Sequence, residues 1–255
     1  MSAPLLEVNG LTKRFGGLNA VRGIDFVLGE GEILGLIGPN GAGKSTTFNM
    51  IAGTYAASAG SIRFAGDSIV GLAPHAIAAR GIMRTFQHNR PFGGMSVIDN
   101  ILVGAHTRFG ASLWSVVLGR SRAEERVRRA RAEELVAFVG LEDFRYAEVT
   151  TLSFGQGRLL EIARALAGEP RLILFDEPAA GLTAPELVRL ARIIRGISAR
   201  GIAVLLIEHD MHFLLPLAER VVVLNFGAKI ADGRPEEIRA DPAVMDAYLG
   251  SHAAA

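Results

Sequence analysis

The sequence predicts an α/β fold with a mostly parallel sheet, and three short apolar runs are the main reason. The first run ends at a Gly-Pro-Asn-Gly loop, the other two are followed directly by acidic residues, and the segments between the runs are long enough for helices. Short runs that are apolar on both faces are typical of strands buried in a parallel sheet. Their alternation with helical segments is typical of a sheet covered by helices. The three runs are Glu32–Ile37, Leu172–Phe175 and Ala203–Ile207.

Two further segments are predicted as strands, and the middle of the chain is predicted as helical. Ser61–Ala65 and Val221–Leu224 have strand-like composition, and the second precedes a turn at Gly227. Between about 104 and 149 strand patterns are scarce, and Ser121–Val139 is rich in Ala, Arg and Glu. Acidic residues interleave with basic ones there, which favours a solvated helix face over a nucleic-acid-binding patch. We therefore expect a helical subdomain inserted into the α/β core.

Composition limits the classes of protein to which this chain can belong. Its 255 residues are 49% hydrophobic and 21% charged, which is enough to bury a core and excludes a disordered chain. The formal net charge of +1 creates no general field for nucleic acid. The absence of cysteine excludes disulfides, thiolate metal sites and a cysteine nucleophile.

The chain shows no sign of a membrane span or a leader segment. No run approaches the ~18 consecutive apolar residues expected of a membrane-spanning helix. The first seven residues, Met1–Glu7, lack a basic region followed by an apolar stretch. We expect a soluble chain without a signal peptide.

A phosphate-binding loop is predicted directly after the first apolar run. The residues match the pattern G-x-x-x-x-G-K-[ST], which chance would produce in roughly one chain in a hundred of this size. Glycines let backbone N–H groups converge on phosphate oxygens, the lysine adds a positive charge, and the serine hydroxyl can bind Mg²⁺. The following helix points its positive end at the same phosphates. The residues concerned are Gly38, Pro39, Asn40, Gly41, Ala42, Gly43, Lys44, Ser45 and Thr46.

Two acidic residues at the end of the second apolar run are candidates for the other half of the site. Asp176 can hold Mg²⁺, often through water, and Glu177 can orient or deprotonate an attacking water. Both residues precede Pro178, so an ordinary surface turn is the alternative interpretation. The phosphate loop elsewhere in the chain favours the functional one.

A third motif lies at the predicted start of a helix. Leu152-Ser153-Phe154-Gly155-Gln156 places Ser153 three residues before Gln156, which is the spacing of a capping box. A structural cap is therefore a sufficient explanation by itself. The same geometry also makes a helix start that can bind an anion.

Taken together, the order and spacing of these motifs resemble the ATP-binding cassette (ABC) family across nearly the whole chain. The usual signature of that family is Leu-Ser-Gly-Gly-Gln, and Phe154 replaces its first glycine here. An aromatic residue at this position resembles one branch of the family. Ser153 and Gly155 are retained, so the departure puts little in doubt.

The resemblance assigns roles to residues that would attract no attention alone. Phe15 resembles the aromatic that stacks on adenine, although a packing residue at a strand end would look the same. Gln87 resembles the glutamine that senses Mg²⁺ and the γ-phosphate. His209 resembles the histidine that contacts the γ-phosphate, where a hydrogen-bonded structural histidine is the alternative. Thr183 stands where many cassettes have aspartate, so the usual carboxylate contact across the dimer interface is in doubt.

The resemblance also implies a domain organisation. One domain is expected over 1–255, with a P-loop NTPase core that carries an antiparallel β subdomain and an inserted α-helical subdomain. The core is expected to comprise 1–87 and 151–255, and the helical insert 88–150. A C-terminal tail is expected from about 233.

What the resemblance implies about function is an ATPase that uses ATP and Mg²⁺ and works as a head-to-tail dimer. Ser153, Gly155 and Gln156 would then complete the ATP site of the opposite subunit. Two transmembrane permease subunits would bind near the Gln87 loop and the helical insert. The chain would lie peripherally on the cytoplasmic face of the inner membrane.

A finer resemblance concerns the transported solute. The strings Leu160-Glu-Ile-Ala-Arg, Ile207-Glu-His-Asp-Met and Gly233-Arg-Pro-Glu-Glu are similar to the larger ATPase of branched-chain amino acid importers. Such importers pair it with a smaller ATPase and a periplasmic solute-binding protein. Importers of urea, amides and aromatic acids belong to the same branch and stay as alternatives. A related cassette for lipopolysaccharide export is usually shorter in the insert and has a two-glycine signature.

Three other classes of protein compete with this interpretation. The first is a non-transport ABC ATPase of DNA repair, translation or iron–sulfur assembly. Repair members would carry a long coiled coil and translation members usually a second cassette, and neither is visible. A small-molecule P-loop kinase would need neither the signature nor His209. A regulatory subunit without hydrolysis would not need Glu177. An ABC transporter ATPase therefore agrees best with the sequence.

Overall fold

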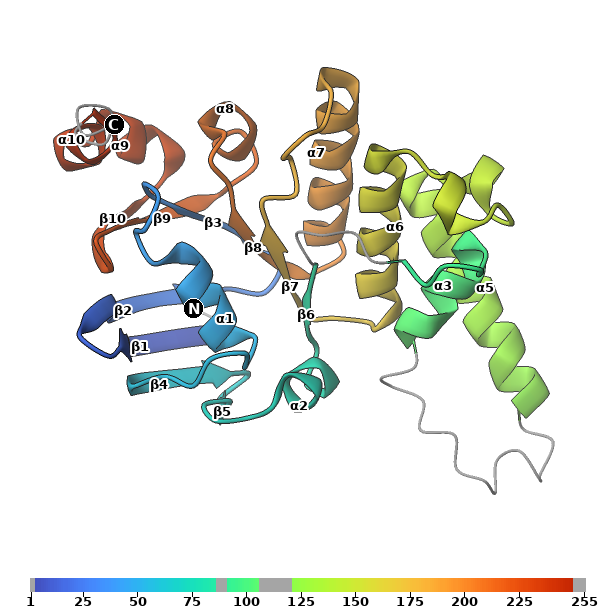
Figure 1. Cartoon of the computed structure of the whole chain (residues 1–255), viewed down its shortest axis with the longest axis horizontal. Coiled ribbons are helices and arrows are strands. Elements are labelled where there is room, and N and C mark those ends of the chain that lie inside the picture. The colour runs from blue at the N-terminus through green and yellow to red at the C-terminus, as the bar shows by residue number, and fades with distance from the viewer. Residues whose placement is uncertain (1–2, 86–90, 106–120, 250–255) are drawn as a thin grey trace.

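The computed structural model describes residues 3–85, 91–105 and 121–249, and they form two sheets with helices packed against them (Figure 1). The strands are β1 (Leu6–Phe15), β2 (Leu18–Leu28), β3 (Ile33–Ile37), β4 (Ala59–Phe64), β5 (Asp67–Ser68), β6 (Ile82–Arg84), β7 (Leu172–Asp176), β8 (Ala203–Ile207), β9 (Arg220–Asn225) and β10 (Ala228–Gly233). The α-helices are α1 (Lys44–Ile51), α2 (Pro74–Ala79), α3 (Val97–Gly104), α5 (Ser121–Val139), α6 (Phe154–Ala167), α7 (Ala184–Ser198), α8 (Met211–Leu214), α9 (Pro235–Ala240) and α10 (Pro242–Leu249). Short 3₁₀ turns cover Glu142–Phe144 and Val149–Thr151.

The larger sheet has the strand order β10-β9-β3-β8-β7-β6. The strands from β9 to β6 are parallel, and only β10 is antiparallel to its neighbour. All residues of β3, β7 and β8 are buried, as expected of central strands covered on both faces. The predicted α/β class and all three predicted central strands are confirmed.

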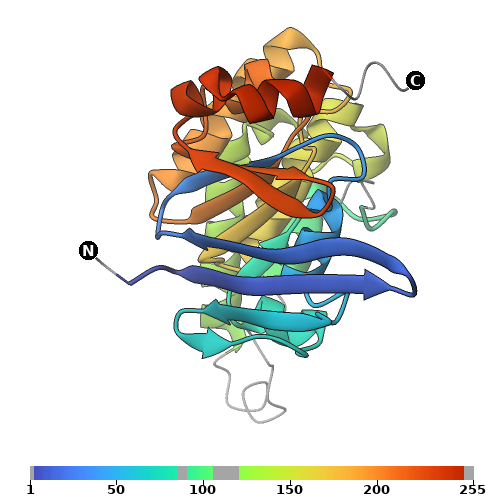
Figure 2. The ribbon, with the colours of Figure 1, turned by 90° about the vertical axis from the view of Figure 1, so that its left-hand side faces the viewer.

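The smaller sheet is antiparallel and has the order β2-β1-β4-β5. Figure 2 shows β1 and β2 running across the molecule, with the β9–β10 hairpin on one side of them and β4 on the other. The predicted strand at 61–65 coincides with β4 up to Phe64, whereas Ala65 lies in the following turn with a φ of 50°. The antiparallel β subdomain implied by the resemblance is confirmed. Register shifts interrupt the pairing of β1 with β2, which obscures the regular alternation by which a strand is recognised in a sequence.

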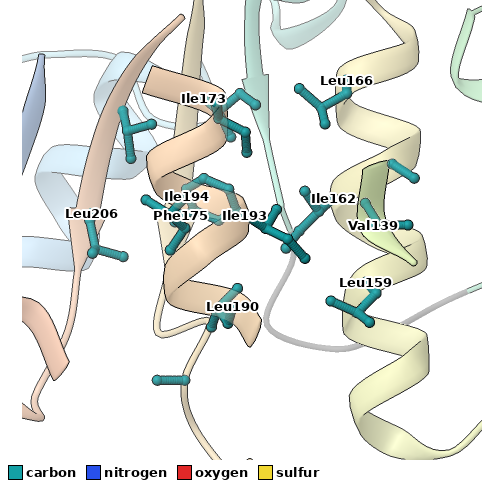
Figure 3. Packing of buried hydrophobic residues seen from close by; sticks show 14 of the residues in the cluster. Val139, Leu159, Ile162, Leu166, Ile173, Phe175, Leu190, Ile193, Ile194 and Leu206 are labelled. Atoms are coloured by element: carbon teal, nitrogen blue, oxygen red, sulfur yellow. The ribbon is translucent and has the colours of Figure 1, made fainter. Parts of the chain in front are cut away.

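Buried apolar side chains form two clusters, one on each face of the larger sheet. One cluster lies between the two sheets and around α1, and includes Phe48, Leu36 and Val8. The other lies under α7 and continues through α6 to α3 and α5, as Figure 3 shows for Phe175 and Ile162. The helical layer is therefore joined to the sheet by continuous apolar packing.

The helical layer is formed by α3, α5 and α6, which pack against one another. Residues 125–131 of α5 are exposed except for a half-buried Arg128, which confirms the predicted solvated charged face. The boundaries predicted for the insert remain a prediction, because nothing in the structure tests them. No helix within the described ranges combines the length and the hydrophobicity needed to cross a bilayer.

Candidate functional site

A cleft of about 380 Å³ lies where β3, β7 and β8 end, beside the turn between β1 and β2. Its size falls within the range of small-molecule sites in proteins. The structure brings the predicted loop, the predicted aromatic, the second acidic residue and the histidine together in this one place. The lining residues are Phe15, Leu18, Asn19, Ala20, Arg22, Asn40, Gly41, Ala42, Gly43, Lys44, Ser45, Thr46, Glu177, His209 and Phe226.

The loop between β3 and α1 requires its glycines. A Cβ atom on Gly38 would lie 2.1 Å from the carbonyl oxygen of Leu224, and one on Gly43 would lie 2.6 Å from that of Ala20. At Gly41 the backbone is left-handed, with φ of 78°, and a Cβ would meet no described atom within 4 Å. The loop is thus packed tightly on one side, while Gly41 leaves the backbone accessible to the cleft.

Lys44 is the only cation of this loop, and its side chain is 5% exposed. Its Nζ donates hydrogen bonds to the carbonyl oxygens of Gly38 (2.6 Å) and Pro39 (3.0 Å). Burial lowers the pKa of Lys44, while Glu177 and Asp176 oppose that shift. The loop therefore holds its ammonium group beside the cleft by two backbone contacts, and these can be exchanged for contacts to an anion.

Asp176 ends β7 and is 6% exposed. Its Oδ2 accepts from the guanidinium of Arg84 at 2.7 Å, and Arg84 also donates to Asn49 Oδ1 at 2.6 Å. Arg84 and Asn49 were not singled out in the sequence, where Arg84 carries no signal beyond its place three residues before Gln87. The pair shows how the buried carboxylate is neutralised by the chain itself.

Glu177 and His209 meet at the mouth of the cleft, with Nε2 of His209 2.8 Å from Oε1 of Glu177. The N–H group of Glu177 donates to the carbonyl oxygen of Ile207 at 3.0 Å, which links the ends of β7 and β8. Glu177 has a φ of 50°, a left-handed conformation that costs a residue with a Cβ about 1–3 kcal/mol. Such strain is concentrated at functional sites in proteins.

Glu208, between the third apolar run and His209, is a buried carboxyl group for which the sequence motifs predicted no role. Its side chain is 4% exposed, and it accepts hydrogen bonds from the N–H groups of Ala179 (2.7 Å) and His209 (3.3 Å). Burial raises the pKa of Glu208 to about 7, with smaller contributions from Glu177 and Asp210, and the two N–H donors oppose this rise. The only sequence signal was an acidic residue directly after a buried strand.

Phe15 is an exposed aromatic ring at the edge of the cleft, 43% exposed. It packs edge-on against Tyr55, with ring centroids 5.4 Å apart, and the Nζ of Lys13 lies 4.8 Å from its centroid. The exposed part of the ring lines the cleft and is available to a ligand. Phe15 is also the last residue of β1, so the alternative of a packing residue at a strand end stays open.

The signature residues are placed elsewhere. Ser153 and Gln156 form the predicted capping box, in which Ser153 Oγ accepts from the Gln156 N–H (3.2 Å) and Gln156 Oε1 accepts from the Ser153 N–H (2.8 Å). Neither they nor Gly155 is among the described residues that line the cleft. Figure 1 shows α6 on the far side of α7 from α1. The signature of this chain is therefore not part of its own cleft.

Gly155 is tightly packed against the next helix. A Cβ at this position would lie 2.0 Å from Oε1 of Glu186. The Oε2 of Glu186 accepts from both the N–H and the Oγ1 of Thr183, at 2.8 and 2.7 Å. Thr183, which stands where many cassettes have aspartate, is thus hydrogen-bonded to a neighbouring carboxylate.

The tail reaches back to the phosphate loop. Tyr248 of α10 hydrogen-bonds to the backbone of Gly38, and burial raises the pKa of its phenol. No local sequence pattern predicts this contact, because the two residues lie 210 positions apart. Gln87, which the resemblance placed at the Mg²⁺ site, lies outside the described residues.

Two sequence families match this chain. The family described as ABC transporter matches residues 21–180, which contain the loop, the signature and the Asp176-Glu177 pair. The family described as branched-chain amino acid ATP-binding cassette transporter matches residues 228–254.

Individual relatives are similar over almost the full length. The high-affinity branched-chain amino acid transport ATP-binding protein BraF of Pseudomonas aeruginosa is 44% identical, with 98% of this chain and 99% of that protein covered. The corresponding protein LivG of Escherichia coli is 41% identical, with the same coverage. The crystal structure of an ATP-binding cassette of an ABC transporter in its ADP conformation is 31% identical, with a TM-score of 0.86 and coverage of 98% of this chain and 100% of that one.

Proposed function

Because this chain belongs to the ABC transporter family, as an ATP-binding cassette ATPase, we propose that it powers an importer of branched-chain or other hydrophobic amino acids. The observation that carries the choice of solute is the match of residues 228–254 to the branched-chain amino acid cassette family. The names of the two relatives support it.

The cleft suits ATP in both shape and chemistry. The exposed ring of Phe15 would stack on adenine at one end. At the other end the backbone around Gly41, the N-terminus of α1 and the ammonium group of Lys44 would receive the phosphates. Asn40, Ala42, Ser45 and Thr46 complete the lining on this side.

Mg²⁺ would be held by few protein groups. No cluster of three or more His, Asp or Glu side chains is arranged for a metal within the described ranges. Mg²⁺ is commonly bound by one or two carboxylates together with water and substrate phosphates. Ser45, Asp176 and Gln87 are the proposed ligands, and Asp176 would exchange its contact with Arg84 for the ion. The ion would neutralise charge on the phosphates.

Glu177 is the proposed general base. Its carboxylate is 22% exposed at the cleft and is held by His209, so it can accept a proton from a water next to the phosphates. His209 would donate a hydrogen bond to the γ-phosphate in place of its present contact. Loss of the γ-phosphate on hydrolysis would end this contact with His209.

A second nucleotide-binding subunit would complete the site. Ser153, Gly155 and Gln156 lie outside this chain's own cleft, so they are proposed to bind the γ-phosphate of ATP held by the partner. The partner is either a smaller cassette ATPase or a second copy. The exposed ring of Phe154, 54% exposed, is proposed to lie at this interface.

The complex would contain two permease subunits and receive solute from a binding protein outside the cell. The permeases would bind the helical insert, 88–150, and the segment around Gln87. The chain would then lie on the cytoplasmic face of the cell membrane. Closure of the two ATPases would move the permeases.

Purification of the tagged chain from its native cells in mild detergent tests this proposal. We expect two polytopic membrane proteins and a cassette ATPase in the mass spectrum. Cells that lack the chain should lose leucine uptake, and a plasmid-borne copy should restore it. Recovery with ribosomal or repair proteins and no membrane subunit would contradict transport. Uptake loss for urea, an amide or an aromatic acid, with leucine uptake intact, would point to a related importer.

Replacement of Phe15 by alanine should weaken ATP binding about fivefold, because an aromatic contact contributes on the order of 1 kcal/mol. Titration with ATP and with tripolyphosphate measures the effect, and only ATP binding should change. Phe226, a second aromatic residue of the cleft lining that is 75% exposed, provides the matched control, Phe226→Ala. Equal losses for ATP and tripolyphosphate would contradict the stacking role.

A further inference from the structure

Glu208 is a buried acid whose position has no role in the mechanism described so far. It follows β8 directly and is one of the few charged side chains that the described core contains. It does not line the cleft, so direct contact with the nucleotide is not its function. Both of its oxygens face backbone N–H groups of segments that carry the site.

We propose that Glu208 is a positioning residue that locks the loop after β7 to the segment carrying His209. The inference rests on the roles proposed above for Glu177 and His209. One oxygen holds Ala179, which lies two residues after Glu177, and the other holds the backbone of His209. The side chains of Glu177 and His209 then meet at 2.8 Å.

Three contacts around Glu208 connect the segment after β7 to the end of β8 and the segment that follows it. The Glu177 N–H donates to Ile207, the Ala179 N–H to Glu208, and the Glu177 carboxylate meets His209. Of these, the Glu177–His209 contact is the most exposed, since the histidine is 44% exposed. A ligand can therefore break it readily, whereas the buried bonds of Glu208 keep both segments in register.

A plain space-filling role does not explain this residue. A buried carboxyl group is costly, as the rise of its pKa to about 7 shows, and an apolar side chain would fill the same space. An apolar side chain would, however, leave the buried N–H of Ala179 without an acceptor. The carboxylate is the group that can accept from both segments at once.

The loop held by Glu208 continues to the predicted dimer interface. Ala179 begins the segment that leads through Gly181 to Thr183, and a Cβ on Gly181 would lie 3.1 Å from the ring of Phe154. Through Glu208, the position of this segment and that of His209 depend on each other. Binding of a partner subunit to this loop would therefore change the position of His209.

The test is a double-mutant cycle on the purified full chain, alone and in the complex recovered from membranes. The variants are Glu208→Gln, His209→Ala and the double variant. Glutamine has one acceptor oxygen, so one of the two N–H groups loses its partner whichever way the amide is turned. We expect kcat to fall about tenfold and the Kd for ATP to change less than about threefold, because misplacement affects catalysis more than binding. In the His209→Ala background Glu208→Gln should add little.

The control is Glu161→Gln, which removes another buried carboxyl, 8% exposed and paired with Arg158. It should lower the Tm without changing kcat per folded molecule. If Glu208→Gln unfolds, Glu208→Ala replaces it, since alanine leaves no buried amide to satisfy. A kcat within twofold of the parent, parallel losses in kcat and affinity, or additive losses in the double variant would overturn the inference. Wild-type hydrolysis by His209→Ala and Glu177→Gln would instead overturn the proposed site and the inference with it.

Discussion

The Lys44→Ala variant is expected to lose tight ATP binding. The ammonium group is 5% exposed, and the loop holds it in place by bonds to Gly38 and Pro39. Loss of charge-assisted bonds to phosphate from such a site costs about 3 kcal/mol or more, which is about a hundredfold in Kd. Isothermal titration with ATP and Mg²⁺ measures this directly.

The matched control for Lys44 is Arg171→Ala. Arg171 is an exposed cation paired with Glu30, and it precedes β7 at the end of the sheet opposite the cleft. The Arg171→Ala variant should bind ATP with the affinity of the parent protein. An unchanged Kd for Lys44→Ala, with the fold intact by circular dichroism, would contradict the phosphate-binding role of the loop.

The Glu177→Gln variant is expected to bind ATP normally and to hydrolyse it about 10²- to 10⁴-fold more slowly, the range for loss of a general base. Glutamine keeps the size of the side chain and can still contact His209, so the site assembles. ATP should then trap a closed dimer, which size-exclusion chromatography detects as a shift that ADP does not produce. Single-turnover kinetics separates the chemical step from product release.

Glu32→Gln is the control for Glu177. Glu32 is 18% exposed and pairs with Arg220, at the start of β3 and away from the cleft. Loss of this ion pair should lower the free energy of unfolding slightly and leave the rate of ATP hydrolysis unchanged. Hydrolysis by Glu177→Gln at the parent rate would show that another group activates the water.

Local sequence is sufficient to predict those features of this protein that are set by residues close together in the chain. The buried runs of β3, β7 and β8, the glycine loop and the capping box of Ser153 are each set by residues close together in the chain. Their physical causes, which are burial periodicity, backbone freedom and helix capping, act over a few residues. The motifs therefore predict the α/β class and the candidate site without any information on tertiary contacts.

The long strands β1 and β2 were harder to predict. Their pairing contains several register shifts, so buried and exposed residues do not alternate regularly. The existence of an antiparallel subdomain came from the family resemblance, because periodicity along the chain did not reveal it. Strand pairing is a property of two segments together.

The sequence by itself determined the class of fold, the residue types of the nucleotide site and the family of this protein. Only the tertiary structure decided which side chains meet: Asp176 with Arg84, Glu208 with Ala179, and Tyr248 with Gly38. These contacts join residues from 29 to 210 positions apart. Their geometry follows from the order of strands in the sheet, and no local pattern encodes that order. The buried acid at 208 acquires its two partners only when the ends of β7 and β8 lie side by side.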